Sequence, residues 1–214
     1  APVDDATSVV VTFHGVDLLA GDDEVVESFE FDPPRMINLL ALQGGNAAAL
    51  IVDETVAAME YEQIRLRVEA FDISGGCMGA ALNSSPTFLT VDPVPSDDPQ
   101  EIIDSGVDRF PLCIPSSSNT GLKLVSGFTV PQGGSASFTI DFDLRKAVAE
   151  PSGVPFQSPQ KYLLRPALRL IDNVEAGTIA GAVDESLLDS TEDGCSDDDP
   201  LTGNAVYVFA GSDV

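Results

Sequence analysis

The chain has 214 residues, of which 43% are hydrophobic and 21% are charged, so it can bury a core as one large all-β domain or two small ones. Acidic side chains outnumber basic ones by 35 to 10, which gives a formal net charge of −25. Because phosphate binding needs basic patches, this excess argues against nucleic acid and anionic membrane surfaces as partners, whereas cations or cationic partners remain compatible with it. No stretch reaches the length of a membrane-spanning helix, so we expect no membrane insertion of this chain.

Short strands separated by turns are predicted in the first third of the chain. The β-branched run at 9–13 predicts a strand, and the alternating segment VVESFEF at 25–31 predicts a second one that stops at Pro33-Pro34. The apolar segment at 35–42 is interpreted as a strand or extended segment that ends at Gly44-Gly45. At 64–70 apolar residues alternate with Arg65, Arg67 and Glu69, which is typical of a strand with one polar face.

The middle of the chain is less regular. Residues 73–107 are rich in Gly, Ser, Pro and Asp and are interpreted as an irregular excursion, with TFLTV at 87–91 as an isolated strand. RFPLCIP at 109–115 predicts a strand that Pro111 would place at a sheet edge or a bulge.

The segment from Gly121 to Val148 has the clearest β pattern. It predicts a strand at 122–125, a strand at 128–130 and a tight turn at PQGG, residues 131–134. Phe138, Ile140 and Phe142 then alternate with polar residues, which indicates a half-buried strand. LRKAV at 144–148 predicts one short helical turn.

The last part of the chain contains three predicted strands and an acidic loop. The strand at 162–171 includes Pro166, which favours an edge position, and further strands are predicted at 178–183 and 204–209, on either side of the acidic loop at 185–201. Short strands with almost no helical period favour an all-β fold, a single antiparallel β-sandwich over residues 1–214, immunoglobulin-like or prealbumin-like.

Three cysteines, Cys77, Cys113 and Cys195, are too few and too scattered for a zinc site. In an exported protein they would form one disulfide and leave one thiol free or paired between molecules. The Cys77–Cys113 pairing is placed slightly ahead of the two others because both residues flank one long excursion.

Clusters of acidic residues are the main feature with binding chemistry. Calcium takes six to eight oxygen ligands, chiefly carboxylates and carbonyls in loops, and bound divalent cations would relieve the repulsion between like charges. No EF-hand spacing is present. Solvated turns or a salt-adapted surface would explain the same residues. The candidate calcium ligands are Asp4, Asp5, Asp22, Asp23, Glu24, Asp97, Asp98, Asp197, Asp198 and Asp199, and two groups could come from different subunits.

Catalytic chemistry has little support in the sequence. The only histidine, His14, is not accompanied by a Gly-x-Ser-x-Gly, Cys-His or metalloprotease motif, so the chain is predicted not to be an enzyme. A second charged group is interpreted as a structural ion-pair network at strand ends. Its members are Asp141, Asp143, Arg145, Lys146, Arg165 and Arg169.

Five phrases of the sequence together resemble a bacterial exported family, the domain of unknown function numbered 4382, over most of the chain. They are VVVTFHGVDL, INLLALQGGNAAALI, GLKLVSGFTVPQGGSASFTIDFDLRKAV, YLLRPALRLIDNVEAGTIAGAV and NAVYVF. The resemblance implies export and a β-sandwich-like domain. Members usually open with an extra strand that ends in Thr-Asp-Ala-Pro, whereas this chain starts at Ala-Pro. Either this strand is removed or another molecule fills its place, and a sheet that lacks its first strand is expected to have an open edge.

These observations lead to two functional hypotheses. The first is a non-catalytic structural protein, extracellular or on the bacterial cell surface, that binds calcium and self-associates by strand addition between subunits. Such a head-to-tail contact can propagate into a filament. The second is a cell-surface module that binds a glycan or a protein through its loops without self-assembly. The lack of Trp and the presence of only three Tyr count against glycan stacking.

Overall fold

The structure is a computed structural model that describes residues 2–43, 46–71, 77–114, 121–150, 162–174 and 176–177. The chain divides into two units, Ala1–Ala176 and Gly177–Val214, and the fold given below is that of the first. The strands predicted at 178–183 and 204–209 and the acidic loop at 185–201 lie outside the described residues, so they stay predictions.

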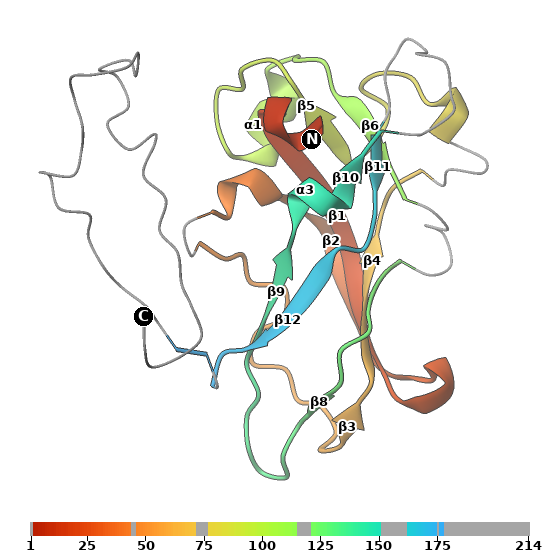
Figure 1. The fold of residues 1–214 in the computed structure, drawn as a ribbon, viewed down its shortest axis with the longest axis vertical. Helices are drawn as coiled ribbons and strands as arrows, with labels where there is room; N and C mark the ends of the chain where they lie inside the picture. Colours follow the sequence, from red (N-terminus) through yellow and green to blue (C-terminus); the bar gives the residue numbers. More distant parts are fainter. Residues whose placement is uncertain are drawn as a thin grey trace, which may run out of the picture. The chain divides into compact units, whose positions relative to one another are not determined.

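One large mixed sheet forms the centre of the first unit (Figure 1). Its strand order is β10-β11-β6-β5-β1-β4-β7, and β2 pairs with β1 off this path. The strands are β1 (Ser8–Leu19), β2 (Val25–Asn38), β4 (Gln63–Val68), β5 (Phe88–Thr90), β6 (Phe110–Cys113), β7 (Leu122–Leu124), β10 (Val148–Ala149) and β11 (Tyr162–Leu164).

Strand β1 links the two halves of this sheet. Residues Ser8–Val10 pair with β5, residues Phe13–Leu19 pair with β4, and β2 pairs along almost the whole strand. Phe13 and Gly15 pair with the adjacent residues Val68 and Arg67 of β4, so His14 is an extra residue in a β-bulge relative to β4. A bulge reverses the in–out alternation of a strand.

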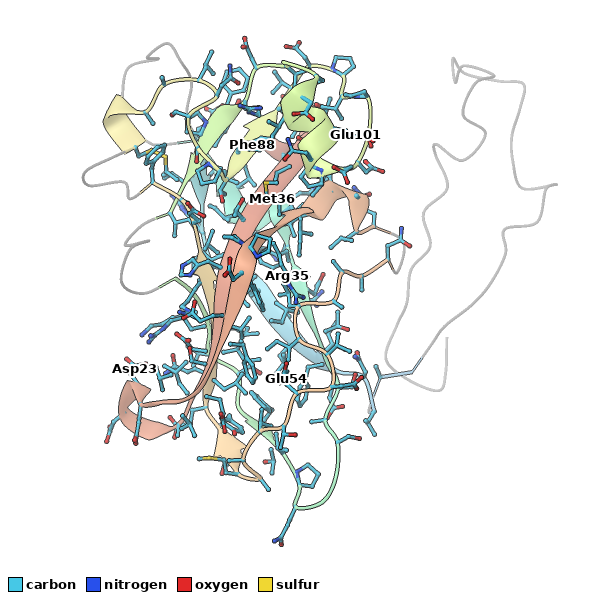
Figure 2. The ribbon with its side chains drawn as sticks, turned by 180° about the vertical axis from the view of Figure 1, so that it is seen from behind. Asp23, Arg35, Met36, Glu54, Phe88 and Glu101 are labelled. Carbon is cyan, nitrogen blue, oxygen red and sulfur yellow. A yellow bond between two sulfur atoms is a disulfide. The ribbon has the colours of Figure 1, made fainter. Side chains whose placement is uncertain are left out.

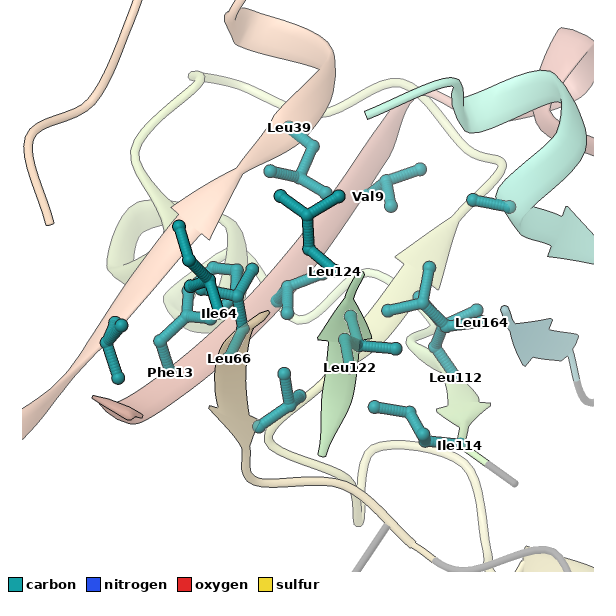
Figure 3. Packing of buried hydrophobic residues seen from close by; sticks show 14 of the residues in the cluster. Val9, Phe13, Leu39, Ile64, Leu66, Leu112, Ile114, Leu122, Leu124 and Leu164 are labelled. Atoms are coloured by element: carbon teal, nitrogen blue, oxygen red, sulfur yellow. The ribbon is translucent and has the colours of Figure 1, made fainter. Parts of the chain in front are cut away.

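The bulge explains which side chains of β1 enter the main core. Before it, Val9, Val11 and Phe13 belong to the core cluster, and after it Val16 and Leu18 do. They pack with apolar side chains of β4, β6, β7 and β11 (Figure 3), namely Ile64, Leu66, Val68, Leu112, Leu122, Leu124 and Leu164. Burial of these side chains from water is the main stabilising contribution to this arrangement.

The opposite face of the sheet is covered at one end by a short helix. Val10 and Phe88 form a second apolar cluster with Ile102 of α1 (Pro99–Asp104), and Met36 of β2 packs against it (Figure 2). This helix lies within the excursion predicted at 73–107, where the sequence pattern predicts only an isolated strand. Asp98 caps it by accepting hydrogen bonds from two backbone amides, those of Gln100 and Glu101.

Two small sheets complete the first unit. β9 (Phe138–Phe142) pairs antiparallel with β12 (Leu168–Asp172), and β3 (Glu60–Tyr61) pairs with β8 (Phe128–Thr129). Phe142 of β9 meets Phe13 of β1 in an edge-to-face contact, with ring centroids 6.5 Å apart, so the β9–β12 sheet packs on the main core.

The remaining elements are short. They are the 3-10 helices η1 (Pro2–Asp5), η2 (Gly21–Asp23), η3 (Leu39–Ala41) and η4 (Cys77–Gly79), and the single-turn helix α3 (Leu144–Ala147). The α3 turn confirms the helical turn predicted near 144–148. The mostly β content is also confirmed.

Four details of the strand predictions were wrong. β2 does not stop at Pro33-Pro34 but continues to Asn38, because β2 is bulged there: Phe13 pairs with Arg35 and Gly15 with Glu30. Pro111 was predicted at an edge or a bulge but lies in β6, which has β5 on one side and β11 on the other. The missing N–H of Pro111 is tolerated because the pairing of β6 with β11 begins only at Leu112.

The two other corrections concern β11. The strand expected over 162–171 is two strands in different sheets, since Pro166 interrupts it and supplies no backbone donor. β11 also pairs parallel with β6, so the large sheet is mixed rather than purely antiparallel. A long connection from Cys113 to Tyr162 is what allows the chain to return in the same direction.

Candidate functional site

The acidic turn between β1 and β2 holds three of the candidate calcium ligands. Asp22 and Asp23 both have positive φ angles, 60° and 62°, a conformation that Asp tolerates better than most residues. Asp23 accepts hydrogen bonds from Lys123 Nζ at 3.1 Å and from Gln63 Nε2 at 2.9 Å. The hydrogen bond from Lys123 is the main cause that lowers the pKa of the Asp23 carboxyl. Asp23 therefore ties this turn to β7 and β4.

The two other described acidic pairs also have structural roles. Asp4 Oδ1 of η1 lies 3.2 Å from Arg145 Nη2 of α3, which links the start of the chain to the helical turn. Asp98 is the N-cap of α1, and its neighbour Asp97 is exposed. Asp5 and Glu24 are exposed as well.

The structure does not bring these acidic pairs together within one chain. Within the described ranges, no group of three or more His, Cys, Asp or Glu side chains is arranged to hold a metal ion. Asp197, Asp198 and Asp199 lie outside the described residues. A calcium site that combines Asp4 and Asp5 with Asp22 to Glu24 of the same subunit is accordingly not seen in this part of the chain, and calcium between subunits stays a prediction.

The charged residues at the ends of β9 and β12 form local ion pairs. Arg169 Nη2 lies 2.5 Å from Asp141 Oδ2, across the β9–β12 pair. Lys146 Nζ lies 2.6 Å from Asp143 Oδ2, and the hydrogen bond from Lys146 lowers the pKa of Asp143. Among the described residues Arg165 forms no ion pair with this group.

A buried ionic network that the sequence patterns do not predict lies on the outer face of the main sheet, the face opposite the Phe13 side chain. Asp17 of β1 is 5% exposed and accepts a hydrogen bond from Ser28 Oγ at 2.8 Å. Arg67 Nε lies 3.2 Å and Arg65 Nη1 3.7 Å from its two carboxylate oxygens, and Arg67 also pairs with Glu30. The signal was present as an Asp inside an apolar strand and as two Arg alternating with apolar residues in β4.

This network rests on the bulge at His14. Without the extra residue, the alternation of β1 would direct Asp17 to the same side as Phe13, into the main core. Gly15 leaves room for the Arg67 guanidinium. A Cβ at this position would overlap Arg67 Nη2 and lie 2.5 Å from the Phe29 carbonyl oxygen. Asp17 and Glu30 pair with the two arginines of β4, so the network connects β2, β1 and β4.

Two of the three cysteines are joined. Cys77 and Cys113 form a disulfide between residues 36 apart in sequence, with a Cα–Cα distance of 5.9 Å. Both are buried and pack with Leu163 of β11. Cys195 lies outside the described residues.

The comparisons with known proteins give a family and no relative of known activity. In the described ranges, no helix is long and apolar enough to cross a membrane. No curated protein and no solved structure matches the chain. Residues 1–166 match the family described as a domain of unknown function, DUF4382. This match covers most of the chain, as the resemblance of the sequence phrases predicts, and the chain belongs to the DUF4382 family.

Proposed function

We propose that this chain is a non-catalytic structural protein of the bacterial cell exterior that self-associates by strand addition. In this proposal the subunits extend into filaments, and calcium binds between acidic loops of neighbouring subunits. The proposal includes a sandwich organisation, in which the β9–β12 sheet forms part of a second layer over the main sheet. The contact of Phe142 with Phe13 supports that arrangement.

The observation that carries the proposal is the state of the β9–β12 sheet. Among the described residues it contains these two strands alone, so each has a backbone edge without a strand partner. Each strand is five residues long, and neither contains a proline or a lysine. Strand edges without proline can act as templates for pairing with another chain, and the charges of Asp141 and Arg169 are already paired with each other.

The disulfide supports the location outside the cell. Buried disulfides such as Cys77–Cys113 form and persist in oxidising compartments and are rare in the cytosol. The net charge of −25 supports the calcium element, because subunits that carry this charge repel one another unless cations are present.

Self-association is tested by measuring the mass of the full chain by light scattering after size exclusion, with electron micrographs of the same samples. With calcium we expect particles larger than one chain, and with a chelator we expect a lower mass and a lower melting temperature. Magnesium at equal concentration controls for general screening of charge. A monodisperse monomer at high concentration with calcium would contradict the assembly, and a mass and melting temperature unchanged by chelator would contradict the calcium element.

A variant can locate the calcium response. Asp22→Asn with Glu24→Gln removes two exposed carboxylates from the η2 turn and leaves the ion pair of Asp23 with Lys123 in place. Loss of the calcium response in this variant would place ligands in that turn. An unchanged response would exclude the turn as a source of ligands.

A further inference from the structure

The backbone geometry of β9 shows which of its groups face the edge that has no strand partner among the described residues. Asp143 N donates to Ala167 O and Asn173 N donates to Ser137 O, and both pairs continue the β9–β12 register. Hydrogen-bonded pairs in an antiparallel ladder alternate with non-hydrogen-bonded ones. The residues whose N–H and C=O groups point away from β12 are therefore Phe138, Ile140 and Phe142.

The long edge strand of the large sheet contrasts with β9. β2 contains Pro33 and Pro34, which lack N–H donors, and its charged side chains engage the neighbouring segment (Figure 2). Arg35 Nη1 donates to the carbonyl oxygens of Ala49 and Leu50, at 3.0 and 2.8 Å. Proline and charge are the usual protections of an edge. β9 has no proline and no register shift against β12, and its one charged residue, Asp141, is paired with Arg169 of β12.

The sequence of β9, FTIDF, is complementary to itself when it is paired antiparallel about Ile140. In that register Phe138 faces Phe142 of the second copy, Ile140 faces Ile140, and Thr139 faces Asp141. Apolar residues then lie opposite apolar residues on the inner face, and no two carboxylates lie directly opposite each other on the outer face. Ile140 points its N–H and C=O outward, so the two copies of Ile140 can form a hydrogen-bonded pair on the two-fold axis.

We propose that the edge of β9 is an interface with the β9 edge of a second copy of this chain, in antiparallel register centred on Ile140. The contact is isologous and joins two β9–β12 sheets into one four-stranded sheet, β12-β9-β9-β12. It rests on the proposed function, since it names the strand through which self-association takes place. A filament then requires a second contact elsewhere on the dimer.

Charge variants at Thr139 test the register. In Thr139→Asp the new carboxylate of each copy lies opposite Asp141 of the other copy, so the dimer contains two repulsive carboxylate pairs. This variant should weaken dimerisation roughly tenfold. Thr139→Lys places a lysine opposite each Asp141 and should strengthen it by a similar factor. Both variants lose the same hydrogen bond from Thr139 to Asn173, so this loss cancels in the comparison. The readout is the dimer dissociation constant from sedimentation velocity.

Gln100→Asp and Gln100→Lys control for the change in net charge. Gln100 is exposed on α1. This helix packs on the face of the main sheet opposite to the core cluster that contains Phe13 and contacts Phe142. These controls should shift the dissociation constant much less than the Thr139 pair does. Equal shifts at both positions, or Thr139 variants that move in the same direction, would overturn the β9 interface.

Cysteine pairs give an independent test in the Cys195→Ser full chain. Residues 139 and 141 face each other across the proposed dimer, so a mixture of the Thr139→Cys and Asp141→Cys proteins should form a disulfide dimer under mild oxidation. Either protein alone should form little disulfide dimer. In that case the two cysteines have the same number and lie two residues apart along the paired strands, so their Cα atoms are too far apart for a disulfide. Crosslinking in the mixture alone, on non-reducing gels, is the expected result.

The outcomes separate this interface from the proposed function. If the wild-type chain associates but the mixed cysteine proteins do not crosslink and the Thr139 variants behave alike, the β9 interface is wrong and self-association stands. If the wild-type chain stays a monomer at all concentrations with calcium, both are wrong.

Discussion

Arg67 on β4 and Asp17 on β1 form an ion pair on the outer face of the large sheet, with Arg67 Nε 3.2 Å from Asp17 Oδ1. The pair exists because the bulge at His14 turns Asp17 away from the core, and Gly15 leaves room for the guanidinium. Asp17 is almost fully covered, whereas the arginine side chains that surround it are 16% and 20% exposed. The carboxylate is thus the centre of a network that joins three strands.

Replacement of Asp17 by Ala should destabilise the fold. The substitution leaves the guanidinium groups of Arg65 and Arg67 without their shared carboxylate partner. It also removes the acceptor of the hydrogen bond from Ser28 Oγ. Removal of one partner of a fully buried pair costs about 3–5 kcal/mol, and the partial exposure of the arginines reduces this to about 2 kcal/mol. Urea unfolding measures the change. Glu30→Gln is the matched control, because Glu30 also pairs with Arg67 but is 67% exposed, and it should cost less than about 1 kcal/mol. Equal losses in the two variants would contradict the buried network.

Gly15→Ala should also destabilise the fold, although alanine is usually more favourable than glycine in the interior of a strand. The added methyl group has no space between Arg67 and the Phe29 carbonyl, so the ion-pair network or the β1–β2 ladder must shift, at a cost of about 1–3 kcal/mol. The comparison is Gly79→Ala in η4, where a Cβ meets nothing within 4 Å. Thermal unfolding of the two variants should show a clear drop for Gly15 and almost none for Gly79.

The ion pair of Lys123 with Asp23 predicts a pH-dependent effect. The folded-state pKa of Asp23 is lowered, chiefly by the Lys123 hydrogen bond. Its contribution to stability is therefore fully present above the unfolded value of about 3.9 and is lost as the pH falls through the lower folded value. Lys123→Met should be slightly less stable than the wild type at pH 6, and the difference should shrink between pH 4 and pH 2. A difference that persists in strong acid would assign the effect to packing of the lysine side chain.

The disulfide should contribute substantially to stability. A crosslink across 36 residues restricts the unfolded chain by about 3–4 kcal/mol in the chain-entropy description. The double variant Cys77→Ser with Cys113→Ser should lose about this amount in urea unfolding, and Cys195→Ser should lose little. Alkylation of the denatured wild-type chain without reductant should label one thiol per molecule, and three labelled thiols would show that the disulfide is absent.

Much of the β structure could be predicted because its signals are local. The alternating patterns of β4 and β9 and the β-branched start of β1 indicate strands from a few neighbouring residues each. The short helical turn α3 is likewise indicated by its own residues. The irregular composition of 73–107 concealed α1, whose six residues are too few for a helical period and whose stability comes from the packing of Ile102.

The roles of the acidic clusters depend mostly on residues far away in the sequence. Their composition suggested shared ligands, but each has another partner in the same chain: Asp23 pairs with Lys123, Asp4 pairs with Arg145, and Asp98 accepts from two backbone amides. Asp and Glu are equally suited to caps, turns and ion pairs, and only the positions of the partners distinguish these roles.

The sequence by itself determined the mostly β character, the strong negative charge and the family, because these depend on composition and on patterns a few residues long. The tertiary structure decided which strands pair, that β6 and β11 run parallel, and that Asp17 meets Arg67 on the outside of the sheet. It also decided that β2 is an edge strand with two prolines, while β9 has neither a proline nor a bulge against β12. Those properties depend on register and on one inserted residue at His14, and a shift of one residue moves every following side chain to the other face.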